Sequence, residues 1–295
     1  MSDPRPPWLC RDRTLTPAPA LVMGIVNVTP DSFSDGGRFA DTETAVAHGL
    51  ELVRQGADLL DVGGESTRPG SQPVPLDEEL RRVVPVVREL AARAGVPVSV
   101  DTSKAEVARQ ALAAGAHVIN DVTALRGDPD MAAAVRDFRA GVVLMHMQGT
   151  PATMQAAPTY ADVAAEVTAF LQERLQAALD LGIAGEQVVL DPGFGFGKTA
   201  AHNLELLARL EGLRRLGRPV CLGVSRKGIL GRLLGRPTEQ RLAGSLALAC
   251  FALGRGAAQV LRVHDVAETR DAVAVYRALE GAAGPTAPRS EESSR

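Results

Sequence analysis

Short apolar runs alternate with longer amphipathic stretches along most of the chain. The run from Leu21 to Val26 is almost continuously apolar, which is typical of a strand that is covered on both faces. Further buried strands are expected at 57–62, 96–100, 116–120, 141–145, 187–190, 219–224 and 257–263. Apolar residues at helical spacing predict helices between them, at 42–56, 77–94, 104–114, 130–138, 160–182, 201–216, 238–255 and 266–280.

This order repeats a strand–helix unit eight times, which matches a (β/α)₈ TIM barrel of about 250 residues. A doubly wound sheet is the alternative architecture, and the regularity of the eight units favours the barrel. Because no low-complexity linker interrupts the units, residues 21–281 are predicted to form a single catalytic domain. The Pro-rich residues 1–20 are expected to be a flexible lead-in, and residues 282–295 a disordered polar tail.

The composition argues against several classes of protein. The 295 residues are 45% hydrophobic but only 3% aromatic, so the core must consist mainly of Val, Leu, Ile and Ala. A formal net charge of −3 gives no reason to expect a nucleic-acid partner. The apolar runs are too short for a membrane span, and the N-terminal sequence lacks the layout of a signal peptide. A soluble cytoplasmic protein without a membrane partner is therefore expected.

Unusual polar residues come directly after the strands rather than before them. In a barrel, the loops that follow the strands all meet at the C-terminal face, where active sites lie. The following residues are therefore predicted to converge: Asn27, Asp31, Thr67, Arg68, Asp101, Asn120, Asp191, Lys227, Arg262 and His264. The sequence contains no nucleophile elbow, no HExxH motif and no Cys/His pair of convincing spacing, so hydrolysis by the common routes is not indicated.

The converging residues fall into two chemical sets. Asp101, Asn120 and Asp191 suit a heterocycle with amino and amide donors on one edge, because a carboxylate can accept two parallel N–H bonds. The second set consists of cations and donors that suit a phosphate or pyrophosphate: Arg68, Arg262, His264 and the hydroxyl of Thr67. The amide oxygen of Asn27 suits Mg²⁺.

The chain resembles the dihydropteroate synthase family roughly from Leu21 to Ala278, and eight stretches match the family's motifs in the same order. They are MGIVNVTPDSFSDGG (23–37), DVGGESTRPG (61–70), VSVDTSK (98–104), VINDV (118–122), LMHMQGTPATMQ (144–155), LDPGFGFGKT (190–199), GVSRKGILG (223–231) and RVHDV (262–266). The resemblance implies a barrel transferase that joins p-aminobenzoate to 6-hydroxymethyl-7,8-dihydropterin pyrophosphate, with Mg²⁺ and with release of pyrophosphate. It also implies a homodimer packed through outer helices, for which 238–255 is a candidate.

The resemblance assigns roles to individual residues. The pterin site would consist of Asp101, Asn120, Met145, Asp191, Phe196 and Lys227. The pyrophosphate and metal would be held by Asn27, Thr67, Arg68, Arg262 and His264. The p-aminobenzoate site would include Phe33, Thr67, Pro69 and Lys227. Asp35 would lie near the metal and the developing cation, so that the catalytic residues would be Asp35, Asp101, Lys227 and Arg262.

Some positions allow other interpretations. Asp101 could instead cap the following helix, and Asp121 is expected to be structural. The segment GFGFGKT (193–199) is not a Walker loop, because Pro192 stands where the first glycine is needed. Gly228 follows Lys227 where the family often has Ser or a larger polar residue, which puts the affinity for p-aminobenzoate in doubt. Two other functions remain open: a methyltetrahydrofolate:corrinoid methyltransferase, and a non-catalytic pterin-binding paralogue.

Overall fold

The computed structural model describes residues 6–28, 37–67 and 70–282. Within these ranges, parallel strands pair in the order β8-β7-β6-β5-β4-β3-β10-β9. Their bounds are β3 Leu21–Asn27, β4 Leu59–Gly63, β5 Val98–Asp101, β6 Val118–Asp121, β7 Gly141–Met145, β8 Val188–Asp191, β9 Cys221–Leu222 and β10 Val260–Val263. A parallel bridge between Leu190 and Val220 joins the two outer strands and closes the sheet. The predicted (β/α)₈ barrel is confirmed.

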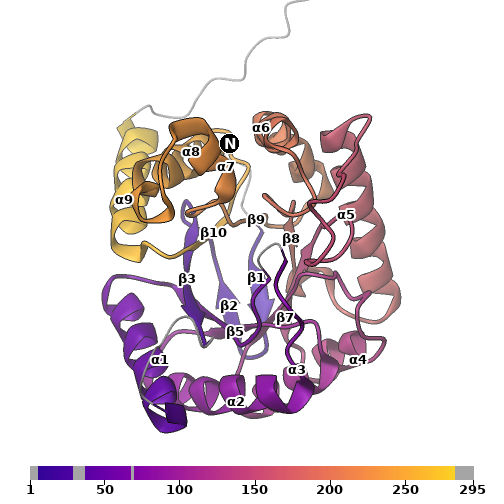
Figure 1. Ribbon diagram of the computed structural model, residues 1–295, viewed down its shortest axis with the longest axis vertical. Coiled ribbons are helices and arrows are strands. Elements are labelled where there is room, and N and C mark those ends of the chain that lie inside the picture. Colours follow the sequence, from indigo (N-terminus) through magenta and orange to yellow (C-terminus); the bar gives the residue numbers. More distant parts are fainter. Residues whose placement is uncertain (1–5, 29–36, 68–69, 283–295) are drawn as a thin grey trace, which may run out of the picture.

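Helices surround the strands in chain order, so that in Figure 1 they form a ring from α1 through α2 and α5 to α9. Their bounds are α1 Gly37–Arg54, α2 Leu76–Arg93, α3 Ala105–Ala113, α4 Met131–Asp137, α5 Val163–Asp180, α6 Ala200–Ala208, α7 Gly228–Leu234, α8 Leu242–Gly254 and α9 Val266–Ala282. The short helix α7 was not predicted, because its seven residues include two glycines and give no amphipathic stripe. Among the described helices, none combines the length and apolar character that a transmembrane span requires.

A β-hairpin seals the N-terminal end of the barrel. Strands β1 (Trp8–Cys10) and β2 (Arg13–Leu15) pair antiparallel, and the side chains of Trp8 and Cys10 are fully buried. The indole Nε1 of Trp8 donates a hydrogen bond to the carbonyl oxygen of Gln187 at 2.8 Å. The expectation of a flexible lead-in is therefore wrong for residues 8–15. Two three-residue strands lie below the length at which an apolar pattern predicts a strand.

The hairpin packs on inward-facing side chains from the first half of the barrel strands. These form one apolar cluster with Trp8 and Cys10: Leu21, Met23, Leu59, Val118, Val143, Val189, Cys221 and Val260. Gly141, at the start of β7, permits the close approach, because a Cβ atom there would lie 2.7 Å from the Cys10 sulfur. A second and larger apolar layer lies between the strands and the helices. Of the predicted tail, 282–295, Ala282 is the last residue of α9 and the rest lies outside the described residues. The domain division stays a prediction.

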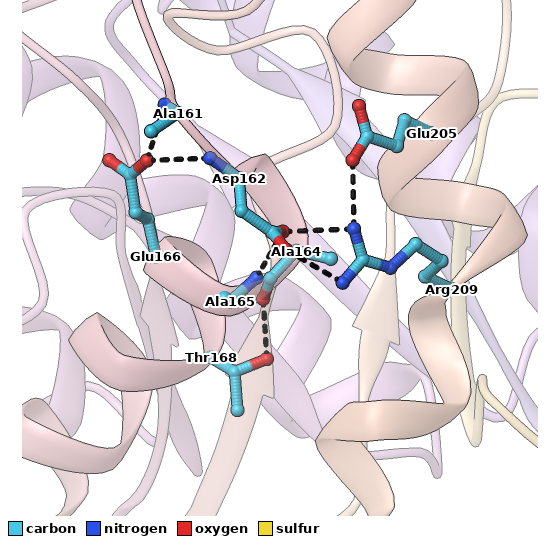
Figure 2. Close-up of polar contacts among 8 residues, drawn as sticks. All are labelled: Ala161, Asp162, Ala164, Ala165, Glu166, Thr168, Glu205 and Arg209. Carbon is cyan, nitrogen blue, oxygen red and sulfur yellow. Dashed lines mark hydrogen bonds and ion pairs between the residues drawn. The ribbon is translucent and has the colours of Figure 1, made fainter.

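An exposed ion-pair network connects the start of α5 to the end of α6 (Figure 2). The Asp162 carboxylate caps α5 by accepting the Ala165 backbone N–H at 2.9 Å, and Glu166 accepts the N–H of Asp162 at 3.0 Å. Arg209 donates to Asp162 at 2.8 Å and to Glu205 at 2.9 Å. Because these groups are exposed to solvent, each pair stabilises the fold only slightly. The network nevertheless connects the two helices that follow β7 and β8.

Candidate active site

The strand ends bring the predicted residues together at the C-terminal face. Residues on neighbouring strands are aligned in the sheet: Asn27 with Gly63, Gly63 with Asp101, and Asp101 with Asn120. Gly63 leaves room between two of these side chains, since a Cβ atom there would lie 4.0 Å from both Asn27 Oδ1 and Asp101 Oδ2. Asp101 and Asn120 are buried. The predicted convergence of these three side chains is confirmed.

A fully buried carboxylate that was not predicted, Asp61 on β4, lies at the centre of this group. Arg262 on β10 donates from Nε to Asp61 Oδ2 at 2.6 Å and from Nη2 to Asp101 Oδ2 at 2.9 Å. The amide Nδ2 of Asn120 donates to the same Asp61 oxygen at 3.1 Å. The other oxygen, Oδ1, accepts no hydrogen bond from the described residues. A single acidic residue inside the apolar strand LLDVG is the sequence signal that could have revealed it.

Burial controls the charges of this group. It raises the pKa of Asp101 to about 7, against the influence of the Arg262 guanidinium and together with that of the Asp61 carboxylate. Burial disfavours the charged form of Arg262, but the carboxylates of Asp61 and Asp101 raise its pKa above the ordinary value. Arg262 therefore remains charged. Asp101 does not cap α3, because the residue at that N-cap position is Lys104.

The residues described so far lie on one side of the opening at the C-terminal face of the barrel, which we call the mouth. The other side of the mouth is formed by the ends of β7, β8 and β9. The Asp191 carboxylate accepts the Gly193 backbone N–H at 2.7 Å, and burial raises its pKa. Lys227 Nζ lies 4.2 Å from the centroid of the Phe196 ring. Burial and the Arg262 charge lower the pKa of Lys227 to about 8, opposed by Asp191 and Asp101.

An apolar wall borders the same side of the mouth. The buried side chains of Val122, Met145, Met147 and Met154 form one cluster, and Phe196 packs against it. Met145 is aligned with Asp191 across β7 and β8. The predicted neighbours of a pterin ring, Met145 and Phe196, therefore lie side by side with one of the predicted polar contacts.

Two buried groups beside this wall, Lys198 and His146, were not assigned a role from the sequence. Lys198 Nζ lies 2.9 Å from His146 Nδ1 and donates to the carbonyl oxygens of Gly193 at 2.9 Å and Phe196 at 3.0 Å. Burial lowers the pKa of His146 to about 3, and the Lys198 charge adds to this effect. His146 is thus a neutral, hydrogen-bonded group. A lysine in a Gly-rich loop gives no sequence signal of burial.

His264 differs from its predicted cationic form. Its Nδ1 lies 3.0 Å from Ser225 Oγ, and its backbone N–H donates to the same oxygen at 3.2 Å. Burial and the charges of Arg262 and Arg226 lower the pKa of His264 to about 4. The imidazole is therefore neutral at pH 7, and a hydrogen bond joins its Nδ1 to the Ser225 hydroxyl; a hydroxyl that donates to Nδ1 leaves Nε2 as the N–H donor.

Several predicted positions are not described. Phe33, Asp35, Arg68 and Pro69 lie outside the described residues, as does Asp31. Thr67 is half-buried at the end of the described part of its loop. Asp121 is structural, as predicted, because its carboxylate accepts the backbone N–H groups of Thr123 and Leu125 at 2.8 Å each.

A barrel mouth that combines acceptors, an arginine, a lysine and an apolar wall defines a class of protein: a (β/α)₈ enzyme for a flat polar heterocycle that carries an anionic group. Comparison with known proteins narrows this class. The family model described as "Pterin binding enzyme" matches residues 23–264. The dihydropteroate synthase of Escherichia coli K12 is 50% identical over 257 residues, which cover 87% of this chain and 90% of that protein.

Two solved structures from Xanthomonas albilineans are similar over nearly their whole length. Dihydropteroate synthase with 4-aminobenzoic acid has a TM-score of 0.88 and 55% identity, over 94% of this chain and 98% of that chain. The same enzyme in complex with 7,8-dihydropteroate has a TM-score of 0.84 and 52% identity, over 93% and 99% of the two chains. The chain belongs to the dihydropteroate synthase family of pterin-binding enzymes. The resemblance of its motifs to this family is confirmed.

Proposed function

We propose that the protein condenses p-aminobenzoate with 6-hydroxymethyl-7,8-dihydropterin pyrophosphate to give 7,8-dihydropteroate and pyrophosphate. One observation carries this proposal: buried hydrogen-bond acceptors in the mouth lie beside an apolar wall, and cations and N–H donors lie next to these acceptors. The solved relatives with 4-aminobenzoic acid and with 7,8-dihydropteroate support it. A methyl transfer to a corrinoid would give the pyrophosphate-binding donors no role.

The pterin is proposed to bind between the acceptors and the wall. The carboxylates of Asp101 and Asp191 would accept N–H groups of the ring. Asn120 uses its Nδ2 for Asp61, which leaves its amide oxygen as a further acceptor. Phe196 would pack against the ring, with Met145 beside it and Lys227 at the edge of the site shared with p-aminobenzoate.

The pyrophosphate is proposed to bind on the donor side. Arg262 keeps both carboxylate contacts through Nε and Nη2, so its remaining N–H groups would face the leaving group. His264 would donate from Nε2 as a neutral imidazole, and Thr67 from its hydroxyl. Arg68, which lies outside the described residues, is proposed as a second cation there. Donors fixed before the reaction stabilise the leaving charge more than mobile water does.

The oxygen atoms of the site fit Mg²⁺ as ligands. Among the described residues, no group of three or more His, Cys, Asp or Glu residues could hold a metal by itself. Mg²⁺ in such enzymes uses one or two protein oxygens and takes its other ligands from phosphates and water. Asn27 Oδ1, beside Asp101 at the Gly63 gap, supplies a protein oxygen of this kind. When bound with the substrate, Mg²⁺ would withdraw negative charge from the leaving pyrophosphate.

The reaction needs no covalent enzyme intermediate. The bond between the methylene carbon and the pyrophosphate oxygen breaks first, and its electron pair leaves with the pyrophosphate. The resulting cation spreads into the electron-rich pterin, where Asp101 and Asp191 favour the positive charge. The amine of p-aminobenzoate then forms the new C–N bond and loses a proton to solvent. Phe33, Thr67, Pro69 and Lys227 are proposed to hold p-aminobenzoate, and Asp35 to lie near the cation.

We also propose that the protein is a cytoplasmic homodimer. Large apolar side chains are exposed on neighbouring outer helices, with Phe251 on α8 and Val275 and Leu279 on α9. Burial of such side chains between two copies would remove them from water. Light scattering coupled to gel filtration would give a mass of about twice 31.0 kDa. A mass equal to that of one chain at micromolar concentration would contradict the dimer.

The test of the activity is product formation by the purified protein with the dihydropterin pyrophosphate, p-aminobenzoate and Mg²⁺, followed by mass spectrometry. Formation of 7,8-dihydropteroate is expected. Methyl transfer from methyltetrahydrofolate to a corrinoid protein, without dihydropteroate, would contradict the proposal. For the site assignment, Asp101→Ala should weaken pterin binding about 10- to 100-fold, because a hydrogen bond to a charged group is lost. Glu106→Ala, an exposed change on α3, is the control.

A further inference from the structure

Lys198 is a buried cation to which the proposed reaction assigns no role. The chain has three lysines among its 32 Lys and Arg residues, and Lys198 is the most deeply buried of them, with 2% of its surface exposed. Burying an ammonium group is costly unless it is fully hydrogen-bonded. Its position in the loop between β8 and α6, next to the mouth, calls for a specific explanation.

The surroundings of Lys198 match an ammonium group. Three acceptors lie within 3.0 Å of Nζ: the carbonyl oxygens of Gly193 and Phe196, and Nδ1 of His146. An ammonium group has three N–H donors and no acceptor, so each donor has one partner. Burial lowers the pKa of Lys198, and the Asp191 carboxylate opposes this shift. Because all its donors are used inside the protein, Lys198 is not available to contact a substrate.

The two carbonyls that Lys198 holds belong to a loop that needs outside support. Gly193, Gly195 and Gly197 have φ angles of +66°, +86° and +58°. Glycine adopts this conformation readily, but fixing a glycine costs more conformational entropy than fixing any other residue. The backbone of Gly193 also lies directly on His146, since a Cβ atom there would be 1.8 Å from the His146 carbonyl oxygen. Lys198 therefore fixes the loop against the end of β7.

This loop determines the positions of three predicted pterin contacts. Gly193 donates its N–H to the Asp191 carboxylate at 2.7 Å. Phe196 lies under Lys227 Nζ at 4.2 Å. Gly195 lies against the Lys227 side chain, since a Cβ atom there would be 3.2 Å from Lys227 Cδ. A shift of the loop would therefore move the acceptor, the ring and the lysine together.

We propose that Lys198 is a positioning residue of the pterin site, which holds the 193–197 loop so that Asp191 and Phe196 are arranged to receive the ring. The inference rests on the proposed function, because it identifies the ring as a pterin. It implies that loss of Lys198 weakens binding of the pterin substrate, which makes all three of these contacts, more than binding of p-aminobenzoate, which shares only Lys227 with them.

Steady-state kinetics of two variants test this role. Lys198→Met keeps the length of the side chain but removes its donors, so KM for the dihydropterin pyrophosphate should rise about tenfold or more. KM for p-aminobenzoate, which shares only Lys227 with the pterin contacts, should rise by less than about threefold. Lys198→Arg, which keeps the charge and the donors, should restore part of the loss.

Gln155→Leu provides the matched control. Gln155 Nε2 donates to the Gly195 carbonyl oxygen of the same loop at 2.9 Å, but from an exposed position, so its loss should change KM by less than about twofold. An unchanged pterin KM in Lys198→Met, or an equal rise in KM for both substrates, would contradict the positioning role. Absence of dihydropteroate with the wild-type protein would instead contradict the proposed function.

If Lys198→Met does not fold, NMR of the wild-type protein labelled with ¹⁵N and ¹³C in lysine tests the same role, because it observes the Lys198 ammonium group directly. With three lysines in the chain, the side-chain spectrum is simple, and Lys104 and Lys227 give internal comparisons. At pH 6, below the pKa of about 7 to which burial lowers this group, Lys198 is expected to give a slowly exchanging ammonium signal that is missing from Lys198→Arg. A rapidly exchanging signal for Lys198, or a ¹³Cε shift typical of a free amine, would overturn the proposal.

Discussion

The two ends of the barrel differ in chemistry, although the same strands supply both. At the N-terminal end, the inward-facing side chains form an apolar cluster under the hairpin, and the one polar group of Trp8 is hydrogen-bonded. Two residues further along four of the strands, the side chains on the same face are polar. The pairs are Leu59 and Asp61, Val118 and Asn120, Val189 and Asp191, and Val260 and Arg262.

This difference separates stability from function within a single sheet. Because side chains on a strand alternate with a period of two, a step of two residues stays inside the barrel and moves from one layer to the next. The lower layer is apolar and buried. The upper layer holds the ionisable side chains of Asp61, Asp101, Asp191 and Arg262, and Asp61 has an oxygen that accepts no hydrogen bond from the described residues. The two layers should therefore respond differently to mutation.

The largest effect is expected from a change in the polar layer. Arg262→Ala removes the partner of both Asp61 and Asp101, and leaving a buried carboxylate unpaired costs about 3–5 kcal/mol of stability. It also removes a donor to pyrophosphate, so kcat/KM should fall about 10³-fold or more and pyrophosphate should bind more weakly. Assays of turnover, of pyrophosphate binding and of urea unfolding test both effects. Arg255→Ala breaks an exposed pair with Glu211 and should leave activity unchanged.

In the apolar layer, Trp8→Ala should affect stability without affecting the chemistry. Removing the fully buried indole should lower the free energy of unfolding by about 3–5 kcal/mol. At a temperature where the variant is folded, kcat/KM should stay within about twofold of the wild type. Leu9→Ala, at an exposed position of the same strand, serves as the control. A selective loss of kcat/KM in folded Trp8→Ala would show that the two ends are not separable.

The pH dependence of binding tests the charges of the polar layer. Asp101 must be ionised to accept N–H groups, and burial raises its pKa to about 7, so pterin affinity should increase as the pH rises from 6 to 7.5. Lys227, whose pKa burial lowers to about 8, loses its proton above that pH, and affinity should fall again. Calorimetric titrations of the pterin pyrophosphate between pH 5.5 and 9 measure both limbs. In Asp101→Ala the rise in affinity between pH 6 and 7.5 should be lost. If the rise persists, a group other than Asp101 causes it.

The smallest effect is expected at Gly228, the first residue of α7. A Cβ atom there would meet no atom within 4 Å, so Gly228→Ser should fold normally. If a side-chain hydroxyl contacts p-aminobenzoate, KM for this substrate should fall about two- to tenfold. Gly281→Ser, in α9, is the matched control. An unchanged KM would indicate that the backbone N–H of Gly228 already makes the contact.

The hydrophobic pattern predicted the barrel because each strand is a short apolar run followed by an amphipathic helix. It also placed Asp101, Asn120 and Asp191 at strand ends, where they are found. It did not predict the hairpin, because the hairpin has few apolar residues and they are buried only by packing against the N-terminal end of the barrel. Asp61 was not predicted, because it lies inside β4 and the predicted site residues were those that follow the strands. The burial of Lys198 depends on contacts with β7 that no local pattern encodes.

The central claim is that the polar layer binds a pterin and releases pyrophosphate from it. The most direct measurement is pyrophosphate release from the dihydropterin pyrophosphate with Mg²⁺, with and without p-aminobenzoate. We expect release to accompany stoichiometric formation of 7,8-dihydropteroate when p-aminobenzoate is present, and to fall about 10³-fold or more in Arg262→Ala. Tight pterin binding without any release of pyrophosphate would contradict the account.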